Sequence, residues 1–170
     1  MKIRYISAGV ATAAALAIMG AGVAAADDYT ALLTDPNQVT DTLAYTPGAP
    51  TMNPGGQPGA SIVWSHRDGR TITDTVWVLA DPAAATAAIT AAQSTAGIAN
   101  PRTEQVAVGN GGQLVSGTNG AQSLSVLYFT QGNAAASIAF AGPIGDPVPT
   151  DLAVELGQSQ AAQIKNRLGG

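Results

Sequence analysis

The only histidine of this chain, His66, stands between Ser65 and Asp68, so the three side-chain types of a hydrolytic triad occur close together. In such a site the imidazole takes a proton from the serine hydroxyl, and a carboxylate orients the ring. Neighbouring residues of a β-strand point to opposite faces, however, so Ser65 does not easily reach His66 within a strand. The spacing therefore favours a polar residue at the end of a hairpin. A hydrolase that uses His66 is the alternative.

Two tryptophans, Trp64 and Trp77, are the next candidates, because indoles on an open sheet face can bind a ligand or a partner. They lie in two β-prone runs on either side of Arg67-Asp68-Gly69-Arg70, and Asp-Gly is typical of a two-residue hairpin turn. Such a turn places both rings on one face, among the threonines of the second run. Alternatively, the N-terminal helix or the proline-rich connector covers them as core. Tyr128 has the same two interpretations, so the candidate ligand- or partner-binding residues are Trp64, Trp77, Tyr128 and His66.

The motifs of most enzyme and metal sites are absent from the sequence. It holds no G-x-S-x-G, no H-E-x-x-H, no calcium-loop spacing and no cysteine. Gly109-Asn110-Gly111-Gly112 resembles a phosphate loop, but no lysine follows it, so we interpret it as a plain turn. We therefore predict no catalytic residue, no metal ligand and no cofactor, and a protein that is not an enzyme.

Residues 1–26 have the pattern of a secretory signal peptide. Lys2 and Arg4 precede an apolar run over residues 6–23, and three alanines form a small-residue cleavage site before Asp27. A retained anchor, which would make the domain an accessory subunit of a membrane complex, is the alternative; a lipid anchor needs a cysteine. We expect cleavage, no stable membrane insertion afterwards, and a protein that is secreted or held in the cell envelope.

The remainder, residues 27–170, fits one domain by length. Two of the seven basic residues and none of the eleven acidic ones fall in residues 1–26. Residues 27–170 therefore contain five basic and eleven acidic residues, which gives a formal net charge of −6. Without a basic stripe, we expect neither nucleic acid nor an anionic membrane surface as a partner.

The order of the expected elements indicates an α+β fold. Residues 27–59 are expected to form a weak helix over 28–43, which contains the cap-and-proline pair Asp35-Pro36, and an irregular connector rich in proline and glycine. Residues 60–170 are expected to form the main α+β domain. Tight turns between its strands predict a mainly antiparallel sheet with flanking helices. One of these turns, Gly132–Asn133, would place Leu127 and Phe129 on one face with Ala136, Ile138 and Phe140. The expected strands are 60–66, 71–80, 102–108, 112–117, 122–130 and 134–141, and the expected helices are 82–96, capped by Asp81, and 151–168, capped by Thr150 or Asp151.

Several strings of this chain are similar to those of small exported mycobacterial proteins. They are SIVWSHRDGRTI from Ser61, WVLADPAAA from Trp77, GQLVSG from Gly112, the 124–129 strand and the terminal 151–168 helix. Together they resemble the LpqN-like lipoproteins and the extracellular sensor domain of the kinase PknH. The resemblance implies an antiparallel sheet with flanking helices, PsbP-like in the first group, and a binding or sensing role in the envelope without known catalysis. This chain lacks both the lipid-bearing cysteine of the lipoproteins and the paired cysteines of the sensor domain.

The sequence thus predicts a non-enzymatic binding or sensing domain of the cell envelope. Its partner would be a protein, a glycan or a lipid, bound through one face of the sheet or through the connector Pro47–Pro58.

Overall fold

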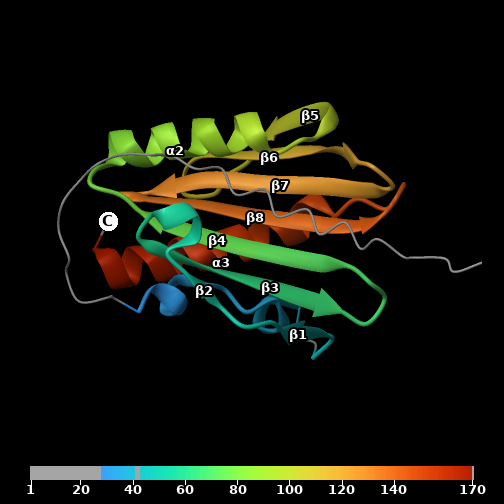
Figure 1. Cartoon of the computed structure of the whole chain (residues 1–170), viewed down its shortest axis with the longest axis horizontal. Coiled ribbons are helices and arrows are strands. Elements are labelled where there is room, and N and C mark those ends of the chain that lie inside the picture. Colours follow the sequence, from blue (N-terminus) through green and yellow to red (C-terminus); the bar gives the residue numbers. More distant parts are fainter. Residues whose placement is uncertain (1–27, 41–42, 170) are drawn as a thin grey trace, which may run out of the picture.

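The structure, a computed structural model, describes residues 28–40 and 43–169, so the expected signal peptide (residues 1–26) lies outside the described residues. Eight strands form one antiparallel sheet in the order β1-β3-β4-β8-β7-β6-β5, and β2 also pairs with β3 (Figure 1). The fold is therefore α+β with an antiparallel sheet and flanking helices, as predicted. The strands are β1 (Tyr45–Pro47), β2 (Thr51–Met52), β3 (Gly59–His66), β4 (Thr71–Val78), β5 (Ala99–Gln105), β6 (Asn110–Asn119), β7 (Gln122–Gln131) and β8 (Ala134–Pro143).

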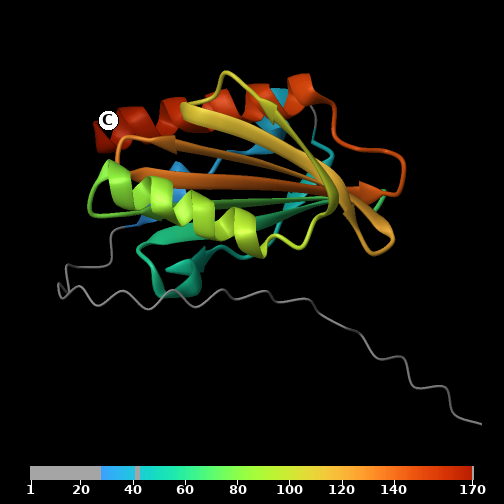
Figure 2. The ribbon, with the colours of Figure 1, turned by 90° about the horizontal axis from the view of Figure 1, so that it is seen from above.

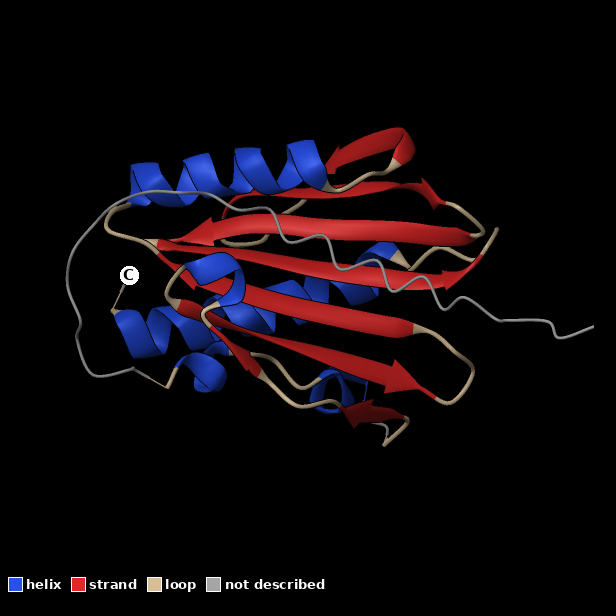
Figure 3. Ribbon diagram, in the orientation of Figure 1, coloured by secondary structure: helices blue, strands red, loops and turns tan. Residues whose placement is uncertain are grey.

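Helices cover both faces of the sheet, as Figures 2 and 3 show. Helix α2 (Pro82–Thr95) packs on β7 and β8 from one side, here called the α2 face. On the other side, the α3 face, α3 (Thr150–Leu168) lies along the sheet together with the short helices η1 (Tyr29–Leu32) and α1 (Pro36–Thr40). The main core fills the space beneath α3 and contains Leu32, Trp64, Ile72, Val76, Leu127, Phe129, Ile138, Phe140, Leu156 and Ile164.

The β7–β8 hairpin has the predicted register. Its turn is Gly132–Asn133, so Leu127 pairs with Ile138 and Phe129 pairs with Ala136. Because paired residues share a face in an antiparallel sheet, these side chains meet beneath α3, and Val126 and Tyr128 point to the α2 face.

The β3–β4 hairpin differs from the prediction by one residue. His66 N donates to Arg70 O (2.8 Å) and Gly69 N donates to His66 O (3.0 Å), so the loop has three residues and not two. Gly69 has a φ of 90°, which only glycine adopts readily, and such a residue closes a three-residue hairpin loop through a bulge. The shift moves every side chain of one strand to the other face relative to its partner. Trp64 therefore pairs with Ile72, and Trp77 pairs with Gly59 on the opposite face.

The connector that was expected to be irregular contains two short strands. β1 and β2 both pair with the outer side of β3, with a 3₁₀ turn, η2 (Pro54–Gly56), after β2. Pro47 pairs with Trp64 on this edge, where a residue without an N–H donor is tolerated. The opposite edge is β5, whose seven residues are all exposed; it contains Pro101 and a register shift between Ala99 and Arg102.

Three helix starts test the capping predictions. Asp35 accepts a hydrogen bond from Asn37 N (2.9 Å), and Asp81 accepts one from Ala84 N (2.8 Å), as expected. The predicted cap of α3 was wrong: the cap residue is Pro149, which has no side-chain hydrogen bond, and Thr150 is already helical.

Replacing Asp81 with alanine is expected to lower the free energy of unfolding by about 1 kcal/mol, because the first turn of α2 loses its acceptor. Urea denaturation of this variant measures the change. Asp81→Asn is the matched control, since asparagine caps equally well, and a similar loss in both variants would contradict the assignment.

Candidate functional site

The aromatic residues predicted to bind a ligand do not form one surface. Trp64 is buried on the α3 face, with 8% of its surface exposed. Trp77 is half-buried on the α2 face, where its Nε1 donates to Pro54 O (3.2 Å). Tyr128 is buried on the α2 face, and burial raises its pKa to about 12. The prediction of a shared Trp64–Trp77 face was wrong, because the register of the β3–β4 hairpin separates the two rings.

His66 lies at the end of β3, in the predicted position. Its Nδ1 is 2.5 Å from Asp68 Oδ1, and its ring stands 5.1 Å from the ring of Tyr45, measured between centroids. Ser65 points to the other face, and no described hydrogen bond joins His66 to a hydroxyl group. Among the described residues, the geometry therefore supplies a histidine and a carboxylate without a serine or threonine hydroxyl hydrogen-bonded to the ring.

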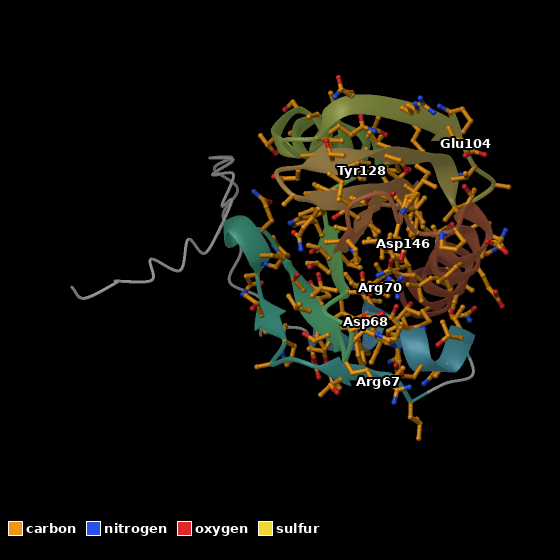
Figure 4. The ribbon with its side chains drawn as sticks, turned by 90° about the vertical axis from the view of Figure 1, so that its right-hand side faces the viewer. Arg67, Asp68, Arg70, Glu104, Tyr128 and Asp146 are labelled. Atoms are coloured by element: carbon orange, nitrogen blue, oxygen red, sulfur yellow. The ribbon has the colours of Figure 1, made fainter. Side chains whose placement is uncertain are left out.

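Arg70 links the β3–β4 turn to the loop between β8 and α3. Its guanidinium forms ion pairs with Asp68 and with Asp146. Figure 4 shows Arg67, Asp68, Arg70 and Asp146 gathered at this end of the sheet. A hydrogen bond to Asp146, together with the negative charges of Asp146 and Asp68, raises the pKa of Arg70. A hydrogen bond from the Arg70 backbone N–H holds the pKa of Asp68 below its usual value. Arg70, Asp68 and Asp146 are thus paired with one another.

A groove of about 290 Å³ opens beside this ion-pair cluster on the α3 face. Ile72 of β4 and Phe140 of β8 belong to its lining and to the core. Most of the other large lining residues are apolar as well. We call this the Tyr45–Leu152 groove; it is lined by Tyr45, Arg70, Thr71, Ile72, Ser123, Phe140, Ala141, Gly142, Asp146, Pro147, Val148, Pro149 and Leu152.

Hydrogen bonds from other elements fix two parts of the groove. The Asn37 side chain accepts from Tyr45 N and donates to Tyr45 O, each at 2.9 Å, so α1 positions Tyr45. On the other side, Ser123 Oγ accepts from Gly145 N (3.0 Å) and holds the loop that carries Asp146. The groove is thus built from segments that are far apart in the sequence.

A second hollow, of about 370 Å³, lies between α2 and strands β6 and β7. Six of its nine lining residues have polar side chains, and a hydrogen bond from Gln93 to Gln113 (2.7 Å) joins two of them. Ile89 and Phe129 are its only large apolar residues. The exposed surface of both hollows is mainly apolar, and the Tyr45–Leu152 groove has the larger number of large apolar side chains in its lining.

The sequence did not point to the Tyr45–Leu152 groove. Arg70 belongs to a run that was expected to form a hairpin turn, and Tyr45 to the region expected to be an irregular connector. A second missed residue, Asp74, had a visible signal, because it is an acidic residue between Ile72 and Val76 on the buried side of β4.

Comparisons with known proteins bear on the fold alone. No family model matches the chain, and no curated protein does. Among solved structures, the crystal structure of the extracellular domain of PknH from Mycobacterium tuberculosis matches 86% of this chain and 97% of its own, with 13% identity and a TM-score of 0.49. This is the kinase sensor domain that the sequence resembles, and no functional residue is transferred from it.

Two further properties concern the described residues, 28–40 and 43–169. No helix among them is both long and apolar enough to cross a membrane. They also contain no cluster of three or more histidine or acidic side chains that could hold a metal ion.

Proposed function

We propose that this chain is an exported, non-enzymatic binding domain that holds the apolar chain of a cell-envelope lipid in the Tyr45–Leu152 groove. One observation carries the proposal: the groove is walled by large apolar side chains, and the charged groups beside it are paired with each other. The signal-peptide pattern of residues 1–26 supports a location outside the cytoplasm.

The pairing of the polar groups favours an apolar ligand over a glycan. Each hydroxyl of a sugar needs a hydrogen-bond partner when it leaves water. In the groove, however, Arg70 and Asp146 bind each other, and Ser123 accepts from Gly145 N. An anionic head group would have to displace a carboxylate from Arg70. The ligand that fits is an alkyl chain with an uncharged head group at the mouth.

The volume of the groove is consistent with one alkyl chain and not with a large ligand. Ligand pockets usually have volumes of about 300–1,000 Å³, and this groove, at about 290 Å³, is just below that range. Val148 and Leu152 are half-buried, so part of their apolar surface is free to contact a ligand.

Dodecyl maltoside below its micelle-forming concentration is a suitable probe, because it joins an alkyl chain to an uncharged sugar. We expect it to shift the NMR signals of the amides of Tyr45, Ile72 and Leu152 in the purified protein. Maltose alone, at the same concentration, is expected to leave them unchanged. Equal shifts with maltose would favour a glycan, and shifts around Gln93 in place of the groove would contradict the proposed site.

The variant Leu152→Glu is expected to weaken binding of the probe at least tenfold, or about 1.4 kcal/mol, because a carboxylate would replace an apolar wall. The matched control is Ala162→Glu, which adds the same charge at an exposed position of α3. Titration by NMR gives both dissociation constants. Unchanged binding in Leu152→Glu, or equal weakening in both variants, would contradict the proposal.

A further inference from the structure

A buried carboxylate joins three parts of the fold beneath α3. Asp74 lies in the middle of β4, between Ile62 of β3 and Ile138 of β8, with 1% of its surface exposed. Its Oδ2 accepts from Thr34 N (2.8 Å), and its Oδ1 accepts from Gln160 Nε2 of α3 (2.5 Å). The sheet, α3 and the segment that follows η1 therefore meet at one side chain.

The same amide also holds the N-terminal segment directly. Gln160 Nε2 donates to Leu32 O (3.3 Å), so Asp74 and Gln160 together bind the backbone on both sides of Leu33. Leu32 is itself buried in the core. The attachment of residues 29–40, here called the N-terminal clasp, thus combines apolar burial with this polar group.

Within residues 28–40 and 43–169, no positive charge forms an ion pair with Asp74. Strand β8, η1 and α1 carry no acidic or basic side chain, and η1 has only Tyr29 as a titratable group. On β3, His66 pairs with Asp68, and Asp35 caps α1. The charged residues of α3 are all exposed; they are Asp151, Glu155, Lys165 and Arg167. With no counter-charge, burial raises the pKa of Asp74 to about 7, although the two hydrogen bonds oppose that shift.

The cluster also contains two buried oxygens without a partner, Thr34 Oγ1 and Gln160 Oε1. A protonated carboxyl is a hydrogen-bond donor and needs an acceptor, whereas an ionised one needs only donors. A rotation of the Thr34 side chain can supply that acceptor and leaves the hydrogen bond from Gln160 Nε2 to Leu32 O in place, whereas a rotation of the Gln160 amide would break it. The two residues that bind the ionised carboxylate thus also carry the atoms that a protonated carboxyl requires.

We propose that Asp74 is a proton-operated latch of the N-terminal clasp: the protonated carboxyl fastens residues 29–40 to the sheet and α3, and ionisation loosens them. The consequence for the ligand rests on the proposed function. Because Asn37 of the clasp holds the backbone of Tyr45, loosening also frees one wall of the Tyr45–Leu152 groove.

The direction of the pH effect follows from the raised pKa. The closed state keeps its proton up to about pH 7, whereas an opened, hydrated Asp74 releases it near its ordinary pKa of about 3.9. Closure is therefore fully stabilised below about pH 4, and this stabilisation is lost as the pH rises through 7. Between these limits, opening becomes about tenfold more frequent for each pH unit.

Amide hydrogen exchange measures this opening in the purified protein. We expect the protection factors of Leu33 and Thr34, corrected for intrinsic exchange, to fall about tenfold per unit between pH 5 and 7. In Asp74→Asn, which stays neutral, they should not change with pH. The amides of α2, which packs on β7 and β8 from the other face of the sheet, are the internal control. The latch would be overturned if the protection factors of the natural protein did not change with pH. It would also be overturned if their pH dependence persisted in Asp74→Asn, or if the amides of α2 showed the same pH dependence.

Two measurements keep the test decisive if Asp74→Asn does not fold. Carbon NMR of the natural protein should show the Asp74 carboxyl titrating near neutral pH, and titration near 4 would overturn the proposal. The variant Gln160→Met removes a donor to the ionised form and should move the exchange transition to higher pH.

Measurements of probe binding at two pH values distinguish the latch from the proposed function. Dodecyl maltoside should bind more weakly at pH 8 than at pH 5 in the natural protein, but equally at both in Asp74→Asn. If the probe binds the groove with no pH dependence, the proposed coupling between ionisation of Asp74 and the groove is wrong, and the proposed function stands. If the probe does not bind while the exchange slope is present, the proposed function is wrong and the latch stands.

Discussion

Replacing Trp64 with alanine is expected to lower the free energy of unfolding by about 3–5 kcal/mol, the usual loss when a large aromatic side chain is removed from a core. Trp64 is buried, pairs with Ile72 across β3–β4 and belongs to the core under α3. Chemical denaturation monitored by circular dichroism measures the change.

Two variants sharpen this test. Trp77→Ala removes a half-buried ring from the other face and should lose clearly less stability. Trp64→Phe should restore most of the loss, because it also removes an Nε1–H group that is buried without an acceptor. Equal losses in Trp64→Ala and Trp77→Ala would mean that the two rings are buried to the same extent, contrary to the β3–β4 register.

Gly157→Val is expected to destabilise the protein by about 3 kcal/mol or more, because α3 packs against the sheet at this residue without room for a side chain. A Cβ added at Gly157 would lie 2.3 Å from Leu127 Cδ2 and 2.9 Å from Val108 Cγ1. Either the helix or the two side chains must move, and both neighbours are fully buried. Thermal and urea denaturation report the loss.

A graded series distinguishes overpacking from helix propensity. Gly157→Ala should lose less than the valine variant, since alanine stabilises a helix by about 1 kcal/mol relative to glycine. Ala162→Val, at an exposed position of α3, introduces the same β-branched residue without the contact and should change stability by less than about 1 kcal/mol. A comparable loss in Ala162→Val would show that backbone propensity, and not packing, is responsible.

Local sequence signals were sufficient where a turn has one favoured geometry. Gly132–Asn133 predicted the β7–β8 register and the residues under α3, and Asp81–Pro82 predicted the start of α2. Asp68–Gly69 was different, because an Asp-Gly pair fits both a two-residue turn and a three-residue loop with glycine at the bulge. The chain adopts the second, which separates Trp64 from Trp77.

The candidate site was not predictable in the same way, because no single stretch of sequence contains it. The groove requires Tyr45, Ile72, Phe140 and Leu152, which the fold brings together from β1, β4, β8 and α3. In the sequence, Arg70 cannot be distinguished from other solvent-exposed turn residues, because its partner Asp146 lies far along the chain. Only Asp74 was recognisable from the sequence, because it is an acidic residue among the apolar residues of one strand face.

The two borders of the sheet limit how molecules of this protein can associate. β5 is exposed along its whole length, yet Pro101 and the register shift beside it interrupt the row of backbone donors and acceptors that a foreign strand would need. At the other border, β1 and β2 are too short to template a long partner. We therefore expect neither border to pair readily with a strand of a second molecule, so that crowded molecules do not extend their sheets into fibrils.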